Sequence, residues 1–320
     1  MSTDFSPDYQ LSDQQKNVHV GEWDNELDPV LTTGSGDVVR FECRDAANGH
    51  FDHNSTVEDL ATKPTSGHPL TGPVYVKDAQ PGDTLVVDFL DFQHKGFGVS
   101  YFYQGEEQKG LLYEEFDDPG LYTWELMEDE GQFVDGIEVP LNPFPGIAGV
   151  APKDSGTHST IPPRAVGGNL DIKHLTVGSR LYLPIEVEGA LFSIGDCHAA
   201  QGDGEVCVTG IEAPMFVTAR LSVDSDVNIQ QPQFETTGPF NNTTESNELV
   251  YATTGISDSL TEAAKLAVRH MITHLGEEHG LSPDQAYILT SSICDLKINQ
   301  VVNKPNWTVS AYIPKSIFPK

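Results

Sequence analysis

The chain has few basic residues and no long hydrophobic run, and each shortage excludes a class of protein. Its 320 residues include 18 Lys and Arg against 48 Asp and Glu, which gives a formal net charge of −30. Nucleic acids and anionic membranes bind basic patches, so we expect neither as a partner. No stretch of the sequence approaches the roughly 20 apolar residues that a membrane-spanning helix needs.

Cysteine is also scarce. The chain has four cysteines, and none belongs to a C-x-x-C pair. The first residues show no basic segment followed by an apolar one, which is the pattern of a secretory signal peptide. Both observations predict a reduced, soluble protein of the cytoplasm.

The acidic residues are spread along the whole chain and do not form a tail. The apolar content is 38% and the aromatic content 9%, which indicates a folded protein with a real core and not a disordered acidic chain. A fold with this charge repels itself, and salt screens that repulsion because the Debye length falls to about 3 Å at 1 M ionic strength. We therefore expect a halophilic protein from a high-salt cytosol.

The residue types that carry chemistry are concentrated at residues 195–205, with the sequence Gly-Asp-Cys-His-Ala-Ala-Gln-Gly-Asp-Gly-Glu. Apolar runs at 190–194 and 206–211 flank this stretch. They predict two strands joined by a glycine-rich turn, where glycine permits positive φ and the close approach of a ligand.

Alternation along those strands predicts which side chains lie together. Residues two apart share a strand face, so Asp196 is expected beside His198, and Asp203 beside Glu205. Carboxylate and imidazole together are typical ligands of a divalent cation. The stretch therefore predicts a metal or catalytic site, and a plain polar hairpin turn is the alternative.

An internal repeat provides a second pattern. Residues 72–87 align with residues 168–183 at a constant offset of 96, and glycine, lysine and leucine recur at equivalent positions. Each copy predicts a strand, a glycine turn and a strand, which indicates two related β modules; chance likeness of short β elements is the alternative. Asp171 of the second copy replaces Tyr75 of the first. It is a candidate ligand, or else a solvent-facing strand residue.

Helical signals are confined to the last quarter of the chain. Ser259 and Glu262 form a capping-box pattern ahead of an apolar stripe, and Gly276 or Gly280 ends that helix. Pro283 begins a second helix. Elsewhere the sequence predicts short strands separated by turns. We therefore predict an α+β fold that is predominantly β, with two related β modules and a C-terminal helical pair.

The predicted organisation has three parts packed as one unit. They are a polar N-terminal segment at 1–37, an N-terminal β module at 38–160, and a C-terminal β module at 161–320 with helices near 259–292. The first strand is expected at 38–43. Residues 144–152 are expected to form a small-residue loop that lets other groups come close.

The chain resembles the acetamidase/formamidase family. The resemblance rests on Gly-Asp-x-His-x-x-Gln-Gly-Asp-Gly-Glu at 195–205, Gly-Gly-Asn-Leu-Asp at 167–171 and Pro-Gly-Ile-Ala-Gly-Val-Ala-Pro at 145–152, and it extends in order from about residue 38 to 318. It implies hydrolysis of short-chain amides such as formamide or acetamide to ammonia and a carboxylic acid. It also implies a β-rich fold, a divalent metal (zinc, with calcium as the alternative) and a homodimer or homotrimer.

The resemblance places the central motif in the active centre, and chemistry assigns a role to each residue. The side chains assigned to the metal are Asp196, His198, Asp171 and Asp45. Those assigned to proton transfer or oxyanion stabilisation are Asp203, Glu205 and Gln201. Those assigned to substrate binding are Asn169, Gly168 and Gly202.

Three other functions stay open at this stage. Cys197 is a possible nucleophile, although adjacent strand residues point to opposite faces and His198 is then badly placed to activate it. A non-catalytic binding protein whose acidic turn holds a stabilising metal is another alternative. Hydrolysis of a larger or cyclic amide depends on pocket size, which the sequence does not show.

Overall fold

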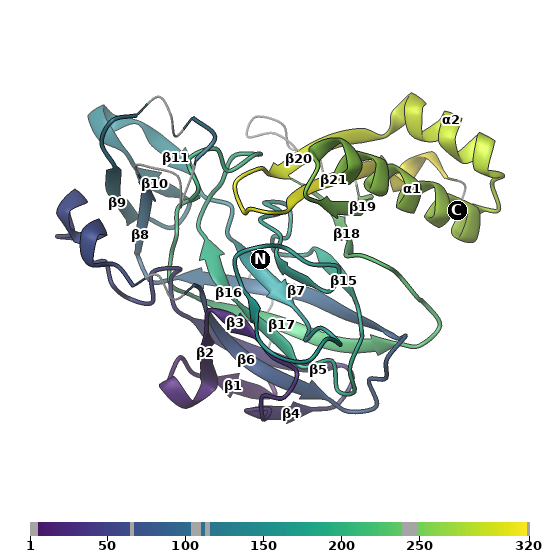
Figure 1. The fold of residues 1–320 in the computed structure, drawn as a ribbon, viewed down its shortest axis with the longest axis horizontal. Coiled ribbons are helices and arrows are strands. Elements are labelled where there is room, and N and C mark those ends of the chain that lie inside the picture. Colours follow the sequence, from purple (N-terminus) through teal and green to yellow (C-terminus); the bar gives the residue numbers. More distant parts are fainter. Residues whose placement is uncertain (1–5, 65–66, 104–109, 113–115, 239–248, 319–320) are drawn as a thin grey trace.

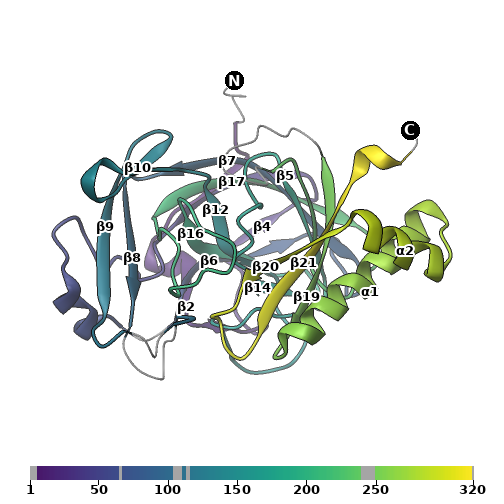
Figure 2. The same ribbon diagram turned by 90° about the horizontal axis from the view of Figure 1, so that it is seen from above.

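The computed structural model describes residues 6–318 except 65–66, 104–109, 113–115 and 239–248. Two main sheets pack against each other, with a small sheet at one end of the long axis and two helices at the other (Figures 1 and 2). None of the helices in the described ranges is both long enough and apolar enough to cross a membrane.

The larger sheet has nine strands in the order β1-β5-β17-β7-β15-β18-β19-β21-β20. Its strands are β1 (Tyr9–Leu11), β5 (Asp37–Cys43), β7 (Thr84–His94), β15 (Arg180–Pro184), β17 (Met215–Asp224), β18 (Gln233–Thr236), β19 (Val250–Ser257), β20 (Asp295–Gln300) and β21 (Trp307–Pro314). Helices α1 (Leu260–His279) and α2 (Pro283–Ile293) lie beside β19 and β21 (Figure 1).

The second sheet follows the order β14-β12-β16-β6-β2, with β4 parallel to β6. Its strands are β2 (Val18–Val20), β4 (Leu31–Thr33), β6 (Pro69–Val76), β12 (Phe144–Gly149), β14 (Gly167–Asn169) and β16 (Phe192–His198). The small sheet consists of β8 (Phe97–Phe102), β9 (Gly120–Leu126), β10 (Glu130–Gln132) and β11 (Glu138–Pro140). A two-stranded ribbon pairs β3 (Glu22–Trp23) with β13 (His158–Ser159).

The main hydrophobic core lies between the two large sheets. Its buried side chains come from both, and the rings of Phe41 in β5 and Phe192 in β16 meet with centroids 5.8 Å apart. A second core joins α1 to β21, where Ala267 and Met271 are buried against Val309. Alternating apolar residues in strands and a stripe at helical spacing in α1 account for both cores.

The pairing of β7 with β15 supports the predicted duplication. Val86 lies directly opposite Tyr182, and these residues are equivalent under the offset of 96. An antiparallel pair in which equivalent residues face each other has the register of a local twofold axis. β6 and β14, the other equivalent strands, flank β16 and β12 symmetrically in the second sheet. The prediction of a predominantly β fold with two related modules is confirmed.

The predicted C-terminal helical pair is also confirmed. Ser259 Oγ accepts a hydrogen bond from the Glu262 N–H at 3.3 Å, and Gly280 ends α1 with a φ of 65°. This is the capping chemistry that the sequence indicates. Strands from both predicted modules alternate within each large sheet, so a boundary at residue 160 divides neither sheet cleanly.

Two predictions of strand position were wrong. The first strand is not at 38–43, because β1 to β4 precede it; each has only two or three residues, too few to show alternation. Residues 206–211, expected as a strand, form turns between β16 and β17. Val206 is 56% exposed and Val208 has a φ of 82°, so the run is not extended; only Ile211, at its end, is buried in the main core.

Residues 144–152 were expected as a loop but begin with the fully buried strand β12. Its small residues serve close packing within the sheet. A Cβ atom at Gly149 would lie 2.6 Å from the backbone nitrogen of Gly168 in the neighbouring strand β14. The expectation of close approach therefore holds, although the backbone is extended.

Candidate active site

Five ionisable side chains are buried together in the second sheet and the turns beside it. Asp196 and His198 belong to β16, Asp171 follows β14, and Glu205 and Glu212 come from the segment between β16 and β17. Each is at most 5% exposed. Charged groups are seldom buried unless they are paired or bind an ion, so this cluster, called the acid cluster below, is the candidate active site.

The acid cluster forms across β12, which separates β14 from β16. Gly146 of β12 provides the space. A Cβ atom there would lie 2.5 Å from the Asp196 carbonyl oxygen, 2.8 Å from Asp171 Oδ1 and 3.0 Å from His198 Nε2. Side chains from two strands that are not neighbours can therefore meet over this glycine.

His198 stands at the centre of the acid cluster. Its Nε2 lies 3.2 Å from Glu212 Oε2 and 3.8 Å from Asp196 Oδ1. Ligand atoms of Asp171, Asp196 and His198 all lie within 4.8 Å of one another, and so do those of His198, Glu205 and Glu212. The imidazole is thus common to two groups, each with the composition of a metal site.

Three of the carboxylates are held by unusual backbone conformations. The φ angles of Asp171, Asp196 and Glu205 are 48°, 50° and 48°. This left-handed region is sparsely populated by residues other than glycine, and strain of this kind is concentrated at functional sites.

Burial determines the protonation of the acid cluster. It raises the pKa of Asp171 to about 7 and of Glu212 to about 8, and it raises the pKa of Glu205 well above its ordinary value. Burial lowers the pKa of His198, but the carboxylates of Glu212 and Asp196 outweigh it and hold that pKa well above its usual range. Protons or a cation must therefore offset these carboxylates.

The acid cluster fits a divalent metal ion. Asp171 Oδ1 and Glu205 Oε2 are buried and have no hydrogen-bond partner among the described residues, whereas Glu212 Oε2 is paired with His198 Nε2 at 3.2 Å. Buried acceptors without a donor are unfavourable, and a cation would satisfy them. Carboxylates with one imidazole form a donor set used for divalent ions.

The sequence-predicted ligands are not all brought together. Asp171, Asp196 and His198 meet, whereas Asp45 belongs to neither group. The Asp45 carboxylate accepts hydrogen bonds from the N–H groups of Ala47, at 2.8 Å, and Gly49, at 2.9 Å. That arrangement closes the turn after β5.

The predicted catalytic residues also separate. Glu205 is buried in the acid cluster, whereas Asp203 is partly exposed and its Oδ2 lies 3.1 Å from Lys173 Nζ. Since 206–211 is not a strand, the two acids do not share a strand face. Gln201 accepts from His198 Nδ1 at 2.6 Å and donates to the Asp171 carbonyl at 3.0 Å.

Of the predicted substrate-binding residues, Gly202 lines the cavity described below, whereas Asn169 and Gly168 do not. Asn169 in β14 is buried; its Nδ2 donates to the Ile161 carbonyl at 2.9 Å, and its Oδ1 has no partner among the described residues. Gly168 precedes it with a φ of 98°. Gly202 lines a cavity together with Gln201, the residue that contacts His198.

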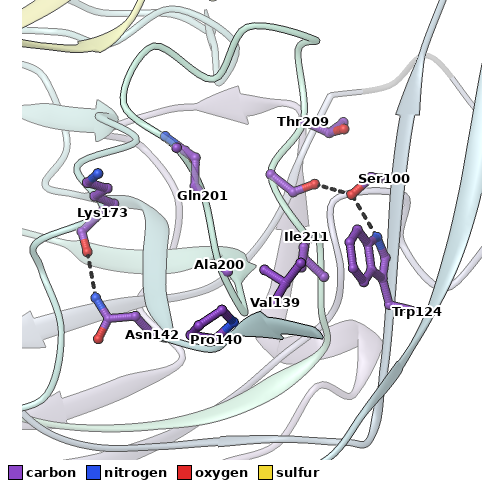
Figure 3. A pocket seen from close by; sticks show the side chains of 12 residues that line it. Ser100, Trp124, Val139, Pro140, Asn142, Lys173, Ala200, Gln201, Thr209 and Ile211 are labelled. Atoms are coloured by element: carbon purple, nitrogen blue, oxygen red, sulfur yellow. Dashed lines mark hydrogen bonds between the residues drawn. The ribbon is translucent and has the colours of Figure 1, made fainter. Parts of the chain in front are cut away.

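That cavity has a volume of about 290 Å³ (Figure 3). Trp124, Val139 and Ile211 provide apolar walls (Figure 3), and Gln201, which also lines the cavity, contacts His198 Nδ1 through its Oε1. Ser100 Oγ accepts from Trp124 Nε1 at 3.0 Å and donates to a backbone carbonyl at 2.5 Å, which fixes one wall.

Sequence reasoning missed several members of the site. Glu212 directly follows the apolar run at 206–211, and its bridge to His198 could only be seen once the chain had folded back. Asn303 donates to the Asp171 carboxylate from a turn 132 residues away. Lys63 and His68 also face the acid cluster; burial lowers both pKa values, and Asp196 acts on both in the opposite direction. Their loop positions gave no signal.

Cys197 points away from the acid cluster into the main core. It is fully buried, and burial raises its pKa well above the ordinary value, with the neighbouring Cys43 thiol adding to the shift. A thiolate nucleophile needs a lowered pKa and access to substrate. The geometry therefore disfavours the cysteine mechanism.

Buried carboxylates and an imidazole at one centre, with unsatisfied oxygens and a neighbouring cavity, are the features of a candidate enzyme active site. A model of the Acetamidase/Formamidase family matches residues 5–159 and 154–320. The chain belongs to this family and is an amidase, a hydrolase of carbon–nitrogen bonds. The match begins at residue 5, so the expected start near residue 38 was wrong.

Individual relatives agree with this assignment. The chain is 27% identical to a formamidase of Methylophilus methylotrophus over 96% of this chain and 90% of the relative. It is 28% identical to an acetamidase of Mycolicibacterium smegmatis over 68% of this chain and 69% of the relative. The crystal structure of an acetamidase from Bacillus halodurans matches with a TM-score of 0.86 and 30% identity, covering 97% of this chain and 98% of that one.

Proposed function

We propose that the protein is a metal-dependent hydrolase of a short linear amide, of the formamide or acetamide type, that releases ammonia and a carboxylate. The observation that carries the metal is the pair of buried carboxylate oxygens without partners, Asp171 Oδ1 and Glu205 Oε2, in the two groups that share His198. The names of the relatives, formamidase and acetamidase, support the substrate class.

The proposed metal ligands are Asp171, Asp196 and His198, to which the geometry adds Glu212. The short distance from Glu212 Oε2 to His198 Nε2, 3.2 Å, supports its addition. Zinc is the proposed ion and calcium the alternative. When bound here, a divalent cation supplies polarisation of a carbonyl and a lower pKa for water.

Glu205 is the proposed general base and acid. It is buried with Oε2 unpartnered, whereas Asp203 is held by Lys173 and partly exposed. Glu205 takes a proton from water as the water oxygen bonds to the amide carbon. It then delivers that proton to the nitrogen as the carbon–nitrogen bond breaks, so that ammonia leaves. Amide nitrogen is a poor leaving group, and this proton is therefore needed.

Asn169 is the proposed contact for the amide nitrogen of the substrate. Its Oδ1 is a buried acceptor without a donor, and the NH₂ group of an amide offers donors of the required kind. Gly168 and Gly202 remain proposed substrate-binding positions, since neither places a side chain in the way.

The cellular setting is also proposed. A net charge of −30 supports a high-salt cytosol, where screening reduces self-repulsion. We propose a homodimer or homotrimer, as the family resemblance implies.

The test is ammonia release from formamide, acetamide and propionamide in molar KCl, before and after chelation and with zinc returned. We expect activity that disappears with the chelator and recovers with zinc. Glu205→Gln should abolish turnover, whereas the matched Asp203→Asn should retain most of it. Activity indifferent to chelation would overturn the metal mechanism. Folded, zinc-loaded protein that releases no ammonia from these amides would overturn the substrate class and favour a lactam or a binding role.

A further inference from the structure

Gln201 connects two parts of the site that β12 holds apart. Its Oε1 lies 2.6 Å from His198 Nδ1, at the end of β16. Its Nε2 donates to the backbone carbonyl of Asp171, after β14, at 3.0 Å. One side-chain amide therefore contacts both of the strand ends that supply the proposed ligands.

The chemistry of these contacts fixes the direction of each hydrogen bond. A backbone carbonyl can only accept, so the NH₂ of Gln201 must face Asp171. The amide oxygen then faces His198 Nδ1, and because that oxygen can only accept, Nδ1 must carry the hydrogen. In a neutral imidazole the lone pair is then on Nε2, the atom that faces Glu212 and Asp196.

We propose that Gln201 is a positioning residue that fixes the hydrogen on Nδ1 of His198 and turns Nε2 toward the acid cluster, while tying the ring to the Asp171 turn. Its assignment to oxyanion stabilisation stays a separate prediction, because these two contacts leave the second hydrogen of the Gln201 Nε2 unused. Only the catalytic consequence depends on the proposed function; the hydrogen bond does not.

The surroundings of Gln201 suit this role. Gln201 lines the cavity (Figure 3). Gly210 lines it too, whereas His198 does not, so the glutamine that bonds Nδ1 stands between that nitrogen and the cavity. A Cβ atom at Gly210 would lie 3.1 Å from His198 Nδ1. Because Gly210 has no side chain to crowd Nδ1, the side-chain amide of Gln201 can approach that nitrogen and bond to it. Partners of this kind orient the histidines that bind metals.

The experiment compares Gln201→Leu, which removes both contacts, with Gln201→Glu, which keeps the acceptor for Nδ1. Asn142→Leu is the matched control: Asn142 lines the same cavity and donates to the Lys173 carbonyl at 3.4 Å, two residues beyond Asp171. Two measurements are made on the full chain: ¹⁵N-histidine NMR of the metal-free protein, with the His198 signal assigned by its loss in His198→Gln, and zinc affinity by competition with a chelator.

The wild type, Gln201→Glu and Asn142→Leu should show an exchange-protected Nδ1 proton on His198, and Gln201→Leu should lose that protection. Zinc affinity should fall about 10- to 100-fold in Gln201→Leu and stay within about twofold in Asn142→Leu. A protected Nδ1 proton in folded Gln201→Leu would overturn the proposal. If the wild type binds no zinc, the proposed function fails, while the NMR result still decides the role of Gln201.

Discussion

The two copies of the β module have side chains of different chemistry at one pair of equivalent positions, Tyr75 and Asp171. Tyr75 in β6 is partly exposed, and its hydroxyl donates to Glu188 Oε1 at the surface, at 2.9 Å. Asp171 is 1% exposed and belongs to the acid cluster. The residues on either side of each are apolar and fully buried, as Val74 and Leu170 illustrate. Packing fixes the flanking residues, and the residue between them is free to differ.

Strand length explains how the second copy turns that residue inward. β6 extends from Pro69 to Val76, whereas β14 ends at Asn169, two residues before Asp171. The chain then turns through a φ of 48° at Asp171. A shorter strand and a left-handed residue thus aim one carboxylate across β12, while the equivalent tyrosine stays on a regular strand.

The largest effect expected from this comparison is on activity. Asp171→Asn should lower kcat/KM by about 10²- to 10⁴-fold, because it removes a proposed ligand whose Oδ1 has no other partner. Tyr75→Phe, at the equivalent position, should change it by less than about twofold. Steady-state ammonia release measures both. Full activity in Asp171→Asn would remove that residue from the site and leave the two copies functionally alike.

In contrast, shortening an equivalent core side chain in either copy should lower the stability of the protein by a similar amount. Leu85 and Leu181 are equivalent, fully buried and on the paired strands β7 and β15. Leu→Ala at either position should lower the free energy of unfolding by about 2–5 kcal/mol, with the two values similar, as measured by urea titration. Val177→Ala, at a residue that is 53% exposed, is the control. Clearly unequal losses would show that the copies share topology without sharing packing.

The parts of the site that lie on one strand could be predicted from the sequence. Asp196 and His198 are two apart in β16, and alternation alone places them together. Likewise, the repeat indicated the β7–β15 relationship, and capping residues located the ends of α1. These are local rules that depend on few neighbours.

The other parts of the site could not be predicted from the sequence, because they depend on chain reversals, which leave no periodic pattern of residues. Glu205 enters the acid cluster through a turn closed by its N–H bonding the Gly202 carbonyl at 3.2 Å, with a φ of 48°. Asp203, expected beside it, instead turns out toward Lys173. Glu212 reaches His198 only after the segment folds back. Alternation cannot anticipate such turns, because it assumes that the strand continues.

The smallest predicted effect tests whether the first copy contributes space to the site of the second. Here the copies are the two predicted modules: β12 lies in the first, at 38–160, and its Gly146 lies against ligands from the second, at 161–320. Gly146→Ala would bring a Cβ atom within 2.8 Å of Asp171 Oδ1 and 3.0 Å of His198 Nε2. We expect a loss of about 1–3 kcal/mol in stability from this overpacking, with weaker zinc binding.

Gly34→Ala is the matched control for Gly146→Ala, because the closest atom to a Cβ there is Asp37 Oδ2 at 3.4 Å, an ordinary contact. Urea unfolding and chelator competition on both variants separate the outcomes. If Gly146→Ala alone weakens zinc binding, the site depends on both copies, since one supplies the carboxylates and imidazole and the other the space in which they meet. If both variants bind zinc like the wild type, the second copy holds its ligands without help from β12.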